Sequence, residues 1–152
     1  MDEIQKNILK TIIWFDLFEY PLKLEEIYFY LLSNTKCLKE DIQREIGRLI
    51  EIGKIKEKDG MCFLSNREGI VNTRQDRYSE SLNKIRRAKK AVKFLRYLPF
   101  IRAVFLCNVL GYLNAKKEDD IDFLIITAPN KIWTTRWFAT GFFKLFHLRP
   151  TT

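Results

Sequence analysis

The sequence predicts an α+β fold in which a helical N-terminal segment with a β-hairpin precedes the start of an α/β domain. Apolar residues recur at helical spacing from residue 3 to residue 51, and a basic amphipathic segment covers residues 81–98. After Pro99 the pattern changes to short, nearly continuous apolar runs, which favour buried strands. We therefore expect three segments, with bounds 1–66, 67–98 and 99–152.

Three helices are expected in the first segment, at residues 3–18, 23–33 and 38–51. Pro21 separates the first from the second, and Gly53 is placed as a C-terminal cap of the third. Each helix has one apolar stripe, formed in turn by Ile4, Ile8, Ile12 and Phe15, by Ile27, Tyr30 and Leu31, and by Ile42, Ile46, Leu49 and Ile50. These stripes predict a small helical core.

Two short alternating runs flank Asp59-Gly60, a dipeptide that favours a two-residue hairpin turn. Three helices followed by a hairpin resemble a winged helix-turn-helix module over residues 3–65. In such a module Arg44 and Arg48 would lie on the recognition helix, and Lys54, Lys56 and Lys58 on the wing. The acidic residues of the same helix leave a second interpretation open, a protein-docking role in place of DNA binding.

The segment 81–98 predicts a helix with one basic and one apolar side. It contains seven basic residues and no acidic one: Lys84, Arg86, Arg87, Lys89, Lys90, Lys93 and Arg96. The whole chain carries a formal net charge of +8, which suits an anionic partner such as nucleic acid. A solvated linker helix without a ligand is the alternative interpretation.

The third segment is expected to contain strands at residues 101–107 and 121–126 and a helix at 131–147. The second strand is apolar on both faces, which predicts a central position in a sheet. No Asp or Glu follows Asp122, and two strands are few for such a domain. We therefore expect residues 99–152 to be the N-terminal part of a larger domain.

Between the two expected strands lies the stretch from Asn108 to Asp122. It resembles the polymerase-β-like nucleotidyltransferase superfamily, in which a Gly-Ser pair ends a strand and an Asp-x-Asp opens the next about ten residues later. Here Asn108-Val109 occupies the Gly-Ser position, Asp120 and Asp122 form the Asp-x-Asp, and Gly111 lies nearby. The resemblance implies that Asn108, Val109 and Gly111 line a nucleoside triphosphate and that both carboxylates hold Mg²⁺ and catalyse.

The carboxylate pair also has an interpretation from strand geometry alone. Residues i and i+2 of a strand point to one face, about 6–7 Å apart, which would allow Asp120 and Asp122 to bind Mg²⁺ through oxygen atoms. Two solvated aspartates at the start of a strand are the alternative. The absence of the Gly-Ser pair and of a later carboxylate leaves both an active and an inactive site possible.

The remaining features restrict the class of protein. Cys37, Cys62 and Cys107 are widely spaced, which argues against a zinc site and favours reduced thiols in the cytosol. No apolar run approaches the length of a membrane span, so no membrane partner is expected. The sequence favours a metal-dependent nucleotidyltransferase-like protein with an unidentified acceptor. The alternative is a winged-helix module that binds DNA or protein and carries a degenerate transferase-like appendage.

Overall fold

The computed structural model describes residues 1–33 and 37–145, with side chains described up to residue 141. It is a mixed α+β chain that divides into two compact units, Met1–Asp76 and Arg77–Thr152. The first division predicted from the sequence lay at residue 66, ten residues before the observed one. No helix in the described ranges is long and apolar enough to cross a membrane.

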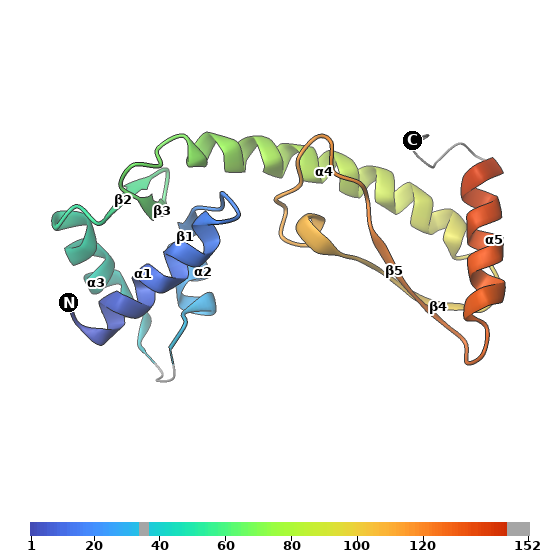
Figure 1. Cartoon of the computed structure of the whole chain (residues 1–152), viewed down its shortest axis with the longest axis horizontal. Coiled ribbons are helices and arrows are strands. Elements are labelled where there is room, and N and C mark those ends of the chain that lie inside the picture. The colour runs from blue at the N-terminus through green and yellow to red at the C-terminus, as the bar shows by residue number, and fades with distance from the viewer. Residues whose placement is uncertain (34–36, 146–152) are drawn as a thin grey trace. The chain divides into compact units, whose positions relative to one another are not determined.

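The first unit packs three helices against a small antiparallel sheet (Figure 1). The elements are α1 (Glu3–Asp16), β1 (Leu22–Lys23), α2 (Leu24–Tyr30), α3 (Lys39–Glu51), β2 (Ile55–Lys58) and β3 (Met61–Leu64). The strand order of the sheet is β1-β3-β2, and both Leu22 of β1 and Glu57 of β2 lie opposite Cys62. All three predicted helices and the hairpin are therefore confirmed, with α2 ending three residues early.

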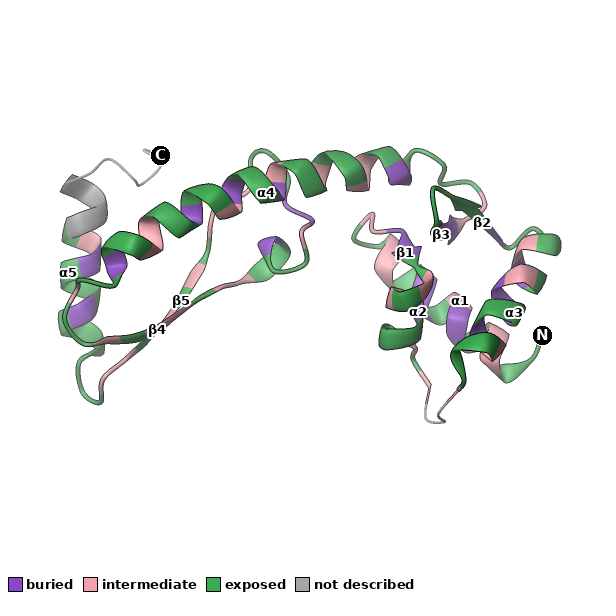
Figure 2. Ribbon diagram, turned by 180° about the vertical axis from the view of Figure 1, so that it is seen from behind, coloured by how far each residue is buried: buried purple, intermediate pink, exposed green. Residues whose placement is uncertain are grey.

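The core of this unit is built from the apolar stripes of its helices. Ile8, Ile27, Ile42 and Leu49 are fully buried together with Ile55. The hairpin turns at Asp59 and Gly60, whose φ angles of 54° and 71° are those of a left-handed turn, which explains the Asp-Gly pair. Figure 2 shows the buried residues in purple along the inner sides of α1 and α3.

The helix α4 (Ile70–Leu95) begins eleven residues before the predicted helix, which was expected at 81–98. Residues 66–80 are mostly polar, but Ile70 and Val71 among them are buried in a cluster with Met61 and Phe63. The early start therefore has a tertiary cause: the first turn of α4 packs on the hairpin of the first unit.

The second unit contains the rest of α4, one hairpin and a final helix. Its elements are β4 (Ile101–Leu106), the short 3-10 helix η1 (Asn108–Leu110), β5 (Phe123–Thr127) and α5 (Ile132–Leu145). The last two residues of the expected helix 131–147 lie outside the described residues. The strands pair antiparallel, with Phe105 opposite Leu124 and Leu106 opposite Phe123.

The expected strand at 121–126 differs in two respects. It starts at Phe123, so Asp120 and Asp122 precede the strand instead of opening it. Its only strand partner among the described residues is β4, and Leu124 and Ile126 are exposed on one face. The prediction of a central strand is therefore wrong for the described part of the chain. Both faces of the strand are apolar, but one of them is exposed.

Candidate functional site

The loop of residues 114–119 is attached to α4 by side chains one turn apart. Ser81 is buried, and its Oγ accepts a 2.9 Å hydrogen bond from the amide of Ala115 and donates one of 2.7 Å to the carbonyl of Arg77. Nη1 of Arg77 donates to Oδ1 of Asn114 over 3.4 Å. These contacts fix the beginning of the loop on the helix.

Lys84 fixes the other end of the same loop. Its side chain is only 3% exposed, and its Nζ donates to the carbonyl oxygens of Lys117 and Asp119 at 2.9 and 2.5 Å. Oε1 of Glu80 lies 4.0 Å from the same nitrogen. A buried ammonium group is costly unless it is paired and hydrogen-bonded, and here the loop carbonyls supply the acceptors. Lys84 thus belongs to the site and not to the exposed basic side of α4.

The acidic turn that precedes Asp120 and Asp122 is stabilised by hydrogen bonds between its own residues. Oδ2 of Asp119 accepts a 2.7 Å hydrogen bond from the amide of Lys116, and the amide of Asp119 donates to the carbonyl of Lys116 over 3.3 Å. The carboxylate of Asp119 therefore caps its own turn.

Asp122 contacts the turn that follows β4. Its Oδ2 accepts a 2.6 Å hydrogen bond from Nδ2 of Asn108, and its carbonyl accepts one of 3.1 Å from the amide of Cys107. Asn108 has a φ of 58°, in the left-handed region that asparagine tolerates better than most residues. The two halves of the sequence motif, Asn108 and Asp122, are thus in direct contact.

Asp120 is exposed and makes no hydrogen bond or ion pair within residues 1–33 and 37–141. It lies outside the hydrogen-bonded part of β5, so the expectation that strand geometry places it on one face with Asp122 does not apply. The reason is local: the chain is held by Lys84 up to Asp119 and joins the ladder only after Asp122.

Val109 and Gly111 lie in the tight turn of η1. The carbonyl of Val109 accepts from the amide of Asn114 at 3.0 Å, and the amide of Gly111 donates to the carbonyl of Asn108 at 2.9 Å. Gly111 has a φ of −64°, so it needs no left-handed freedom, but a β-carbon there would lie 3.2 Å from the carbonyl oxygen of Asn108. Glycine is favoured at this position by close packing.

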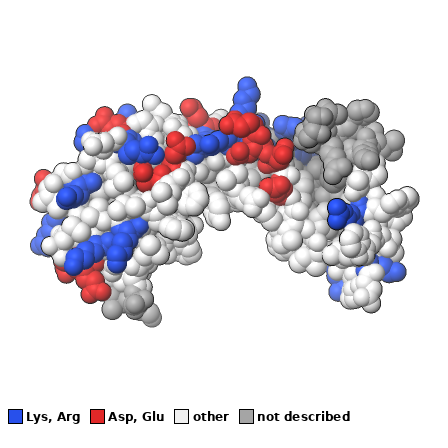
Figure 3. All heavy atoms as spheres, in the orientation of Figure 1, with Lys and Arg blue, Asp and Glu red and all other residues white. Residues whose placement is uncertain are grey.

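The candidate nucleic-acid residues of the first unit are mostly engaged with carboxylates. Arg44 pairs with Asp41 at 2.6 Å, Arg48 with Glu45 at 2.8 Å, and Lys56 with Glu68 at 2.5 Å. Figure 3 shows acidic atoms interspersed with the basic ones over this unit.

Two of the predicted wing residues, unlike Arg44, Arg48 and Lys56, have no carboxylate partner within hydrogen-bonding distance among the described residues. Lys54 and Lys58 are exposed, and neither forms an ion pair in the described ranges. This segment therefore carries two lysines without an ion pair in the described ranges, one on each side of the paired Lys56.

Glu45 is a carboxylate partner of both arginines of α3. It is 2% exposed, and its Oε2 accepts a 2.9 Å hydrogen bond from Nε2 of Gln5 on α1. Burial raises the pKa of this carboxyl, but the bonds from Gln5 and Arg48 outweigh it, so the pKa lies below its usual value. Glu45 thus links α1 to α3.

Comparison with known proteins adds no assignment. No family model matches the chain, no curated protein matches it, and no solved structure matches it. The part of the chain that the structure describes also contains no group of three or more His, Cys, Asp or Glu side chains placed to hold a metal ion.

Proposed function

We propose that the second unit is a nucleotidyltransferase-like unit that binds a nucleoside triphosphate with Mg²⁺ and transfers its nucleotidyl group. The observation that carries the proposal is the 2.6 Å hydrogen bond between Nδ2 of Asn108 and Oδ2 of Asp122. It joins the residue at the Gly-Ser position to the second carboxylate of the Asp-x-Asp, across 14 residues of sequence. This contact supports the assignment of both parts of the motif to one site.

The donor set fits Mg²⁺. This ion prefers oxygen ligands and is commonly bound by one or two carboxylates together with substrate phosphates. The hydrogen bond from Asn108 engages one oxygen of Asp122, and Asp120 is exposed beside it in sequence. Bound there, Mg²⁺ would neutralise charge on the triphosphate.

The residues of the chain would hold the substrate in place. Asn108 orients the carboxylate of Asp122, and Ser81 and Lys84 fix the loop that leads to Asp120. Val109 has no hydroxyl, so contact with the triphosphate at this turn would come from Asn108 and backbone amides. Gly111 keeps the turn compact.

Calorimetric titration with ATP and GTP, with and without Mg²⁺, tests this proposal. We expect Mg²⁺-dependent binding that is lost in Asp122→Asn and retained in Asp59→Asn, a matched change at the exposed hairpin turn of the first unit. Equal binding by both variants would remove Asp122 from the site. No binding by the unaltered chain would overturn the proposal for these residues.

A second candidate function concerns the first unit, which we propose to be a winged-helix module that docks a protein. The order α1-β1-α2-α3-β2-β3 and the sheet order β1-β3-β2 support the winged-helix assignment. Arg44 and Arg48 are paired with Asp41 and Glu45, which disfavours DNA reading by α3.

The end of α1 supports a protein partner. It exposes four apolar side chains on neighbouring positions: Ile13, Trp14, Leu17 and Phe18. An exposed apolar cluster of this kind is typical of protein-binding surfaces. Titration with a labelled DNA duplex tests the assignment: we expect no loss of affinity in Arg44→Gln/Arg48→Gln, and a large loss would favour DNA reading by α3.

A further inference from the structure

The exposed side of α4 in the second unit carries an unusual density of positive charge. We call it the basic face, formed by Arg86, Arg87, Lys89, Lys90, Lys93 and Arg96. All six residues are exposed, and the helix contains no acidic residue after Glu80. At 1.5 Å per residue they extend along roughly 15 Å of helix.

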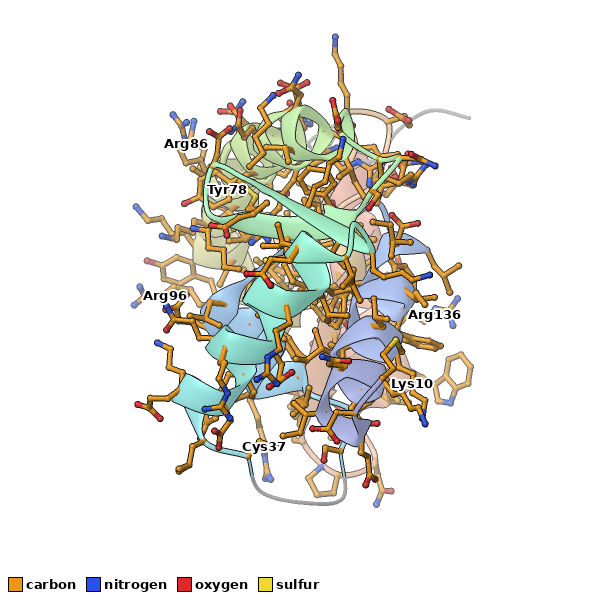
Figure 4. All side chains as sticks on the ribbon, turned by 90° about the vertical axis from the view of Figure 1, so that its left-hand side faces the viewer. Lys10, Cys37, Tyr78, Arg86, Arg96 and Arg136 are labelled. Carbon is orange, nitrogen blue, oxygen red and sulfur yellow. The ribbon has the colours of Figure 1, made fainter. Side chains whose placement is uncertain are left out.

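The orientation of this face is fixed by the opposite side of the helix. Ala88 and Leu95 are buried, at 1% and 0% exposure, and Lys84 is held by the carbonyls of the loop 114–119. With 100° between successive residues, Arg86, Lys89, Lys90, Lys93 and Arg96 lie on the side away from these positions, and Arg87 lies at the edge of that side. Figure 4 shows the labelled side chains of Arg86 and Arg96 projecting to the same side of the view.

No carboxylate of residues 1–33 or 37–141 pairs with the basic face. Arg86 donates a 2.9 Å hydrogen bond to the neutral side chain of Asn83, and the guanidinium of Arg96 lies 5.3 Å from the ring centroid of Tyr97. By contrast, Arg48 and Arg74 of the first unit have carboxylate partners. The charge on α4 is therefore available to an external anion.

Two aromatic side chains are exposed beside these cations. Phe94 is 51% exposed, and Tyr97, just after the last turn of α4, is 77% exposed. A surface that combines cations with accessible aromatic rings suits single-stranded nucleic acid, because phosphates contact the cations and unpaired bases stack on the rings.

A membrane surface is the competing partner, and the packing of α4 disfavours it. An interfacial helix inserts a continuous apolar face into the lipid. The apolar side of α4 at Ala88 and Leu95 is already buried within its own unit. The exposed side chains are those of the basic face together with the rings of Phe94 and Tyr97.

We propose that the basic face of α4, together with Phe94 and Tyr97, binds single-stranded nucleic acid through the phosphate backbone and base stacking. This proposal does not depend on nucleotidyl transfer, because none of these residues belongs to the candidate site at Asp120 and Asp122. It would hold for a chain that is catalytically inactive.

Fluorescence anisotropy of the whole chain with a labelled oligothymidylate, over a series of salt concentrations, tests the proposal. Contacts from all six cations would give a slope of log affinity against log salt of about −4, at about −0.7 for each phosphate. In Lys89→Gln/Lys90→Gln/Lys93→Gln we expect this slope to fall to about −2 and low-salt affinity to drop at least about tenfold. In Phe94→Ala/Tyr97→Ala, binding of the single strand should weaken more than binding of a duplex.

The matched control is Lys6→Gln/Lys10→Gln/Lys23→Gln, which removes the same charge from exposed positions of α1 and β1 in the first unit and should leave binding almost unchanged. Three outcomes would overturn the proposal: no binding of the oligonucleotide, equal loss in both triple variants, or full binding by the α4 variant. Vesicles of phosphatidylserine and phosphatidylcholine identify the competing partner. Vesicle binding that needs Lys89, Lys90 and Lys93, without oligonucleotide binding, would assign the face to a membrane.

Discussion

The side-chain amide of Asn108 donates a 2.6 Å hydrogen bond to Oδ2 of Asp122 across the β4–β5 hairpin. Asn108 adopts a left-handed backbone conformation at the end of β4, and Asp122 lies immediately before β5. This bond ties the strand-ending turn to the carboxylate that we propose as a metal ligand.

Replacing Asn108 separates the role of its backbone from that of its amide. Asn108→Gly removes the hydrogen bond but tolerates the φ of 58°, whereas Asn108→Ala removes it and also places a β-carbon in the left-handed region. We expect the alanine variant to be less stable than the glycine variant by about 1 kcal/mol. Urea unfolding followed by tryptophan fluorescence measures this difference, and equal stabilities would contradict it.

Lys84 should matter for stability far more than the cations on the outer side of α4. Lys84→Met leaves the carbonyls of Lys117 and Asp119 without their charged donor, and we expect a loss of about 1–3 kcal/mol. Lys89→Met changes an exposed position and should stay within about 0.5 kcal/mol of the unaltered chain. Chemical denaturation of both variants tests this, and similar losses would show that the Lys84 contacts contribute little.

The pair Glu26–Arg74 should give the first unit an acid-sensitive contribution to stability. Burial raises the pKa of Glu26, but the two hydrogen bonds from Arg74, at 2.8 and 2.6 Å, outweigh it and hold the pKa below 4.5. A carboxyl group whose pKa is lowered on folding stabilises the fold at pH values above its pKa in the unfolded chain. This contribution is lost as the pH falls through the pKa of the group in the folded state. The expected window therefore lies below about pH 4.5.

Glu26→Gln isolates that contribution. At pH 7 we expect the variant to be about 2 kcal/mol less stable, because Arg74 loses its charged acceptor. Below pH 4.5 the difference from the unaltered chain should shrink, since protonation removes the same charge there. Urea unfolding at a series of pH values measures the stability difference at pH 7 and its decrease below pH 4.5. A difference that stays constant with pH would mean that the carboxyl group has the same pKa in the folded and unfolded states.

Two glycines should respond in opposite directions to alanine. Gly47 lies inside α3, and a β-carbon there would meet nothing within 4 Å, so Gly47→Ala should stabilise the first unit by about 0.5–1 kcal/mol. At Gly111 the new β-carbon would press on the carbonyl oxygen of Asn108 at 3.2 Å. Gly111→Ala should therefore be destabilising, and thermal unfolding of the two variants distinguishes the signs.

The sequence by itself determined those local elements whose structure follows from the residues within them. The apolar stripe of residues 38–51 defines the buried side of α3, and Asp59-Gly60 defines the hairpin turn because both residues take positive φ angles. The hydrogen bond between Asn108 and Asp122, by contrast, depends on the antiparallel pairing of β4 with β5, which the sequence did not predict.

Only the tertiary structure decided where helices begin and which polar residues are internal. The start of α4 at Ile70 depends on burial against Met61 and Phe63, which no local pattern reveals. Lys84 looked like one more cation of a basic helix, yet the carbonyls of a loop more than thirty residues away make it an internal donor. The physical reason is the same in both cases: burial and hydrogen bonding between distant segments outweigh local propensity and charge pattern.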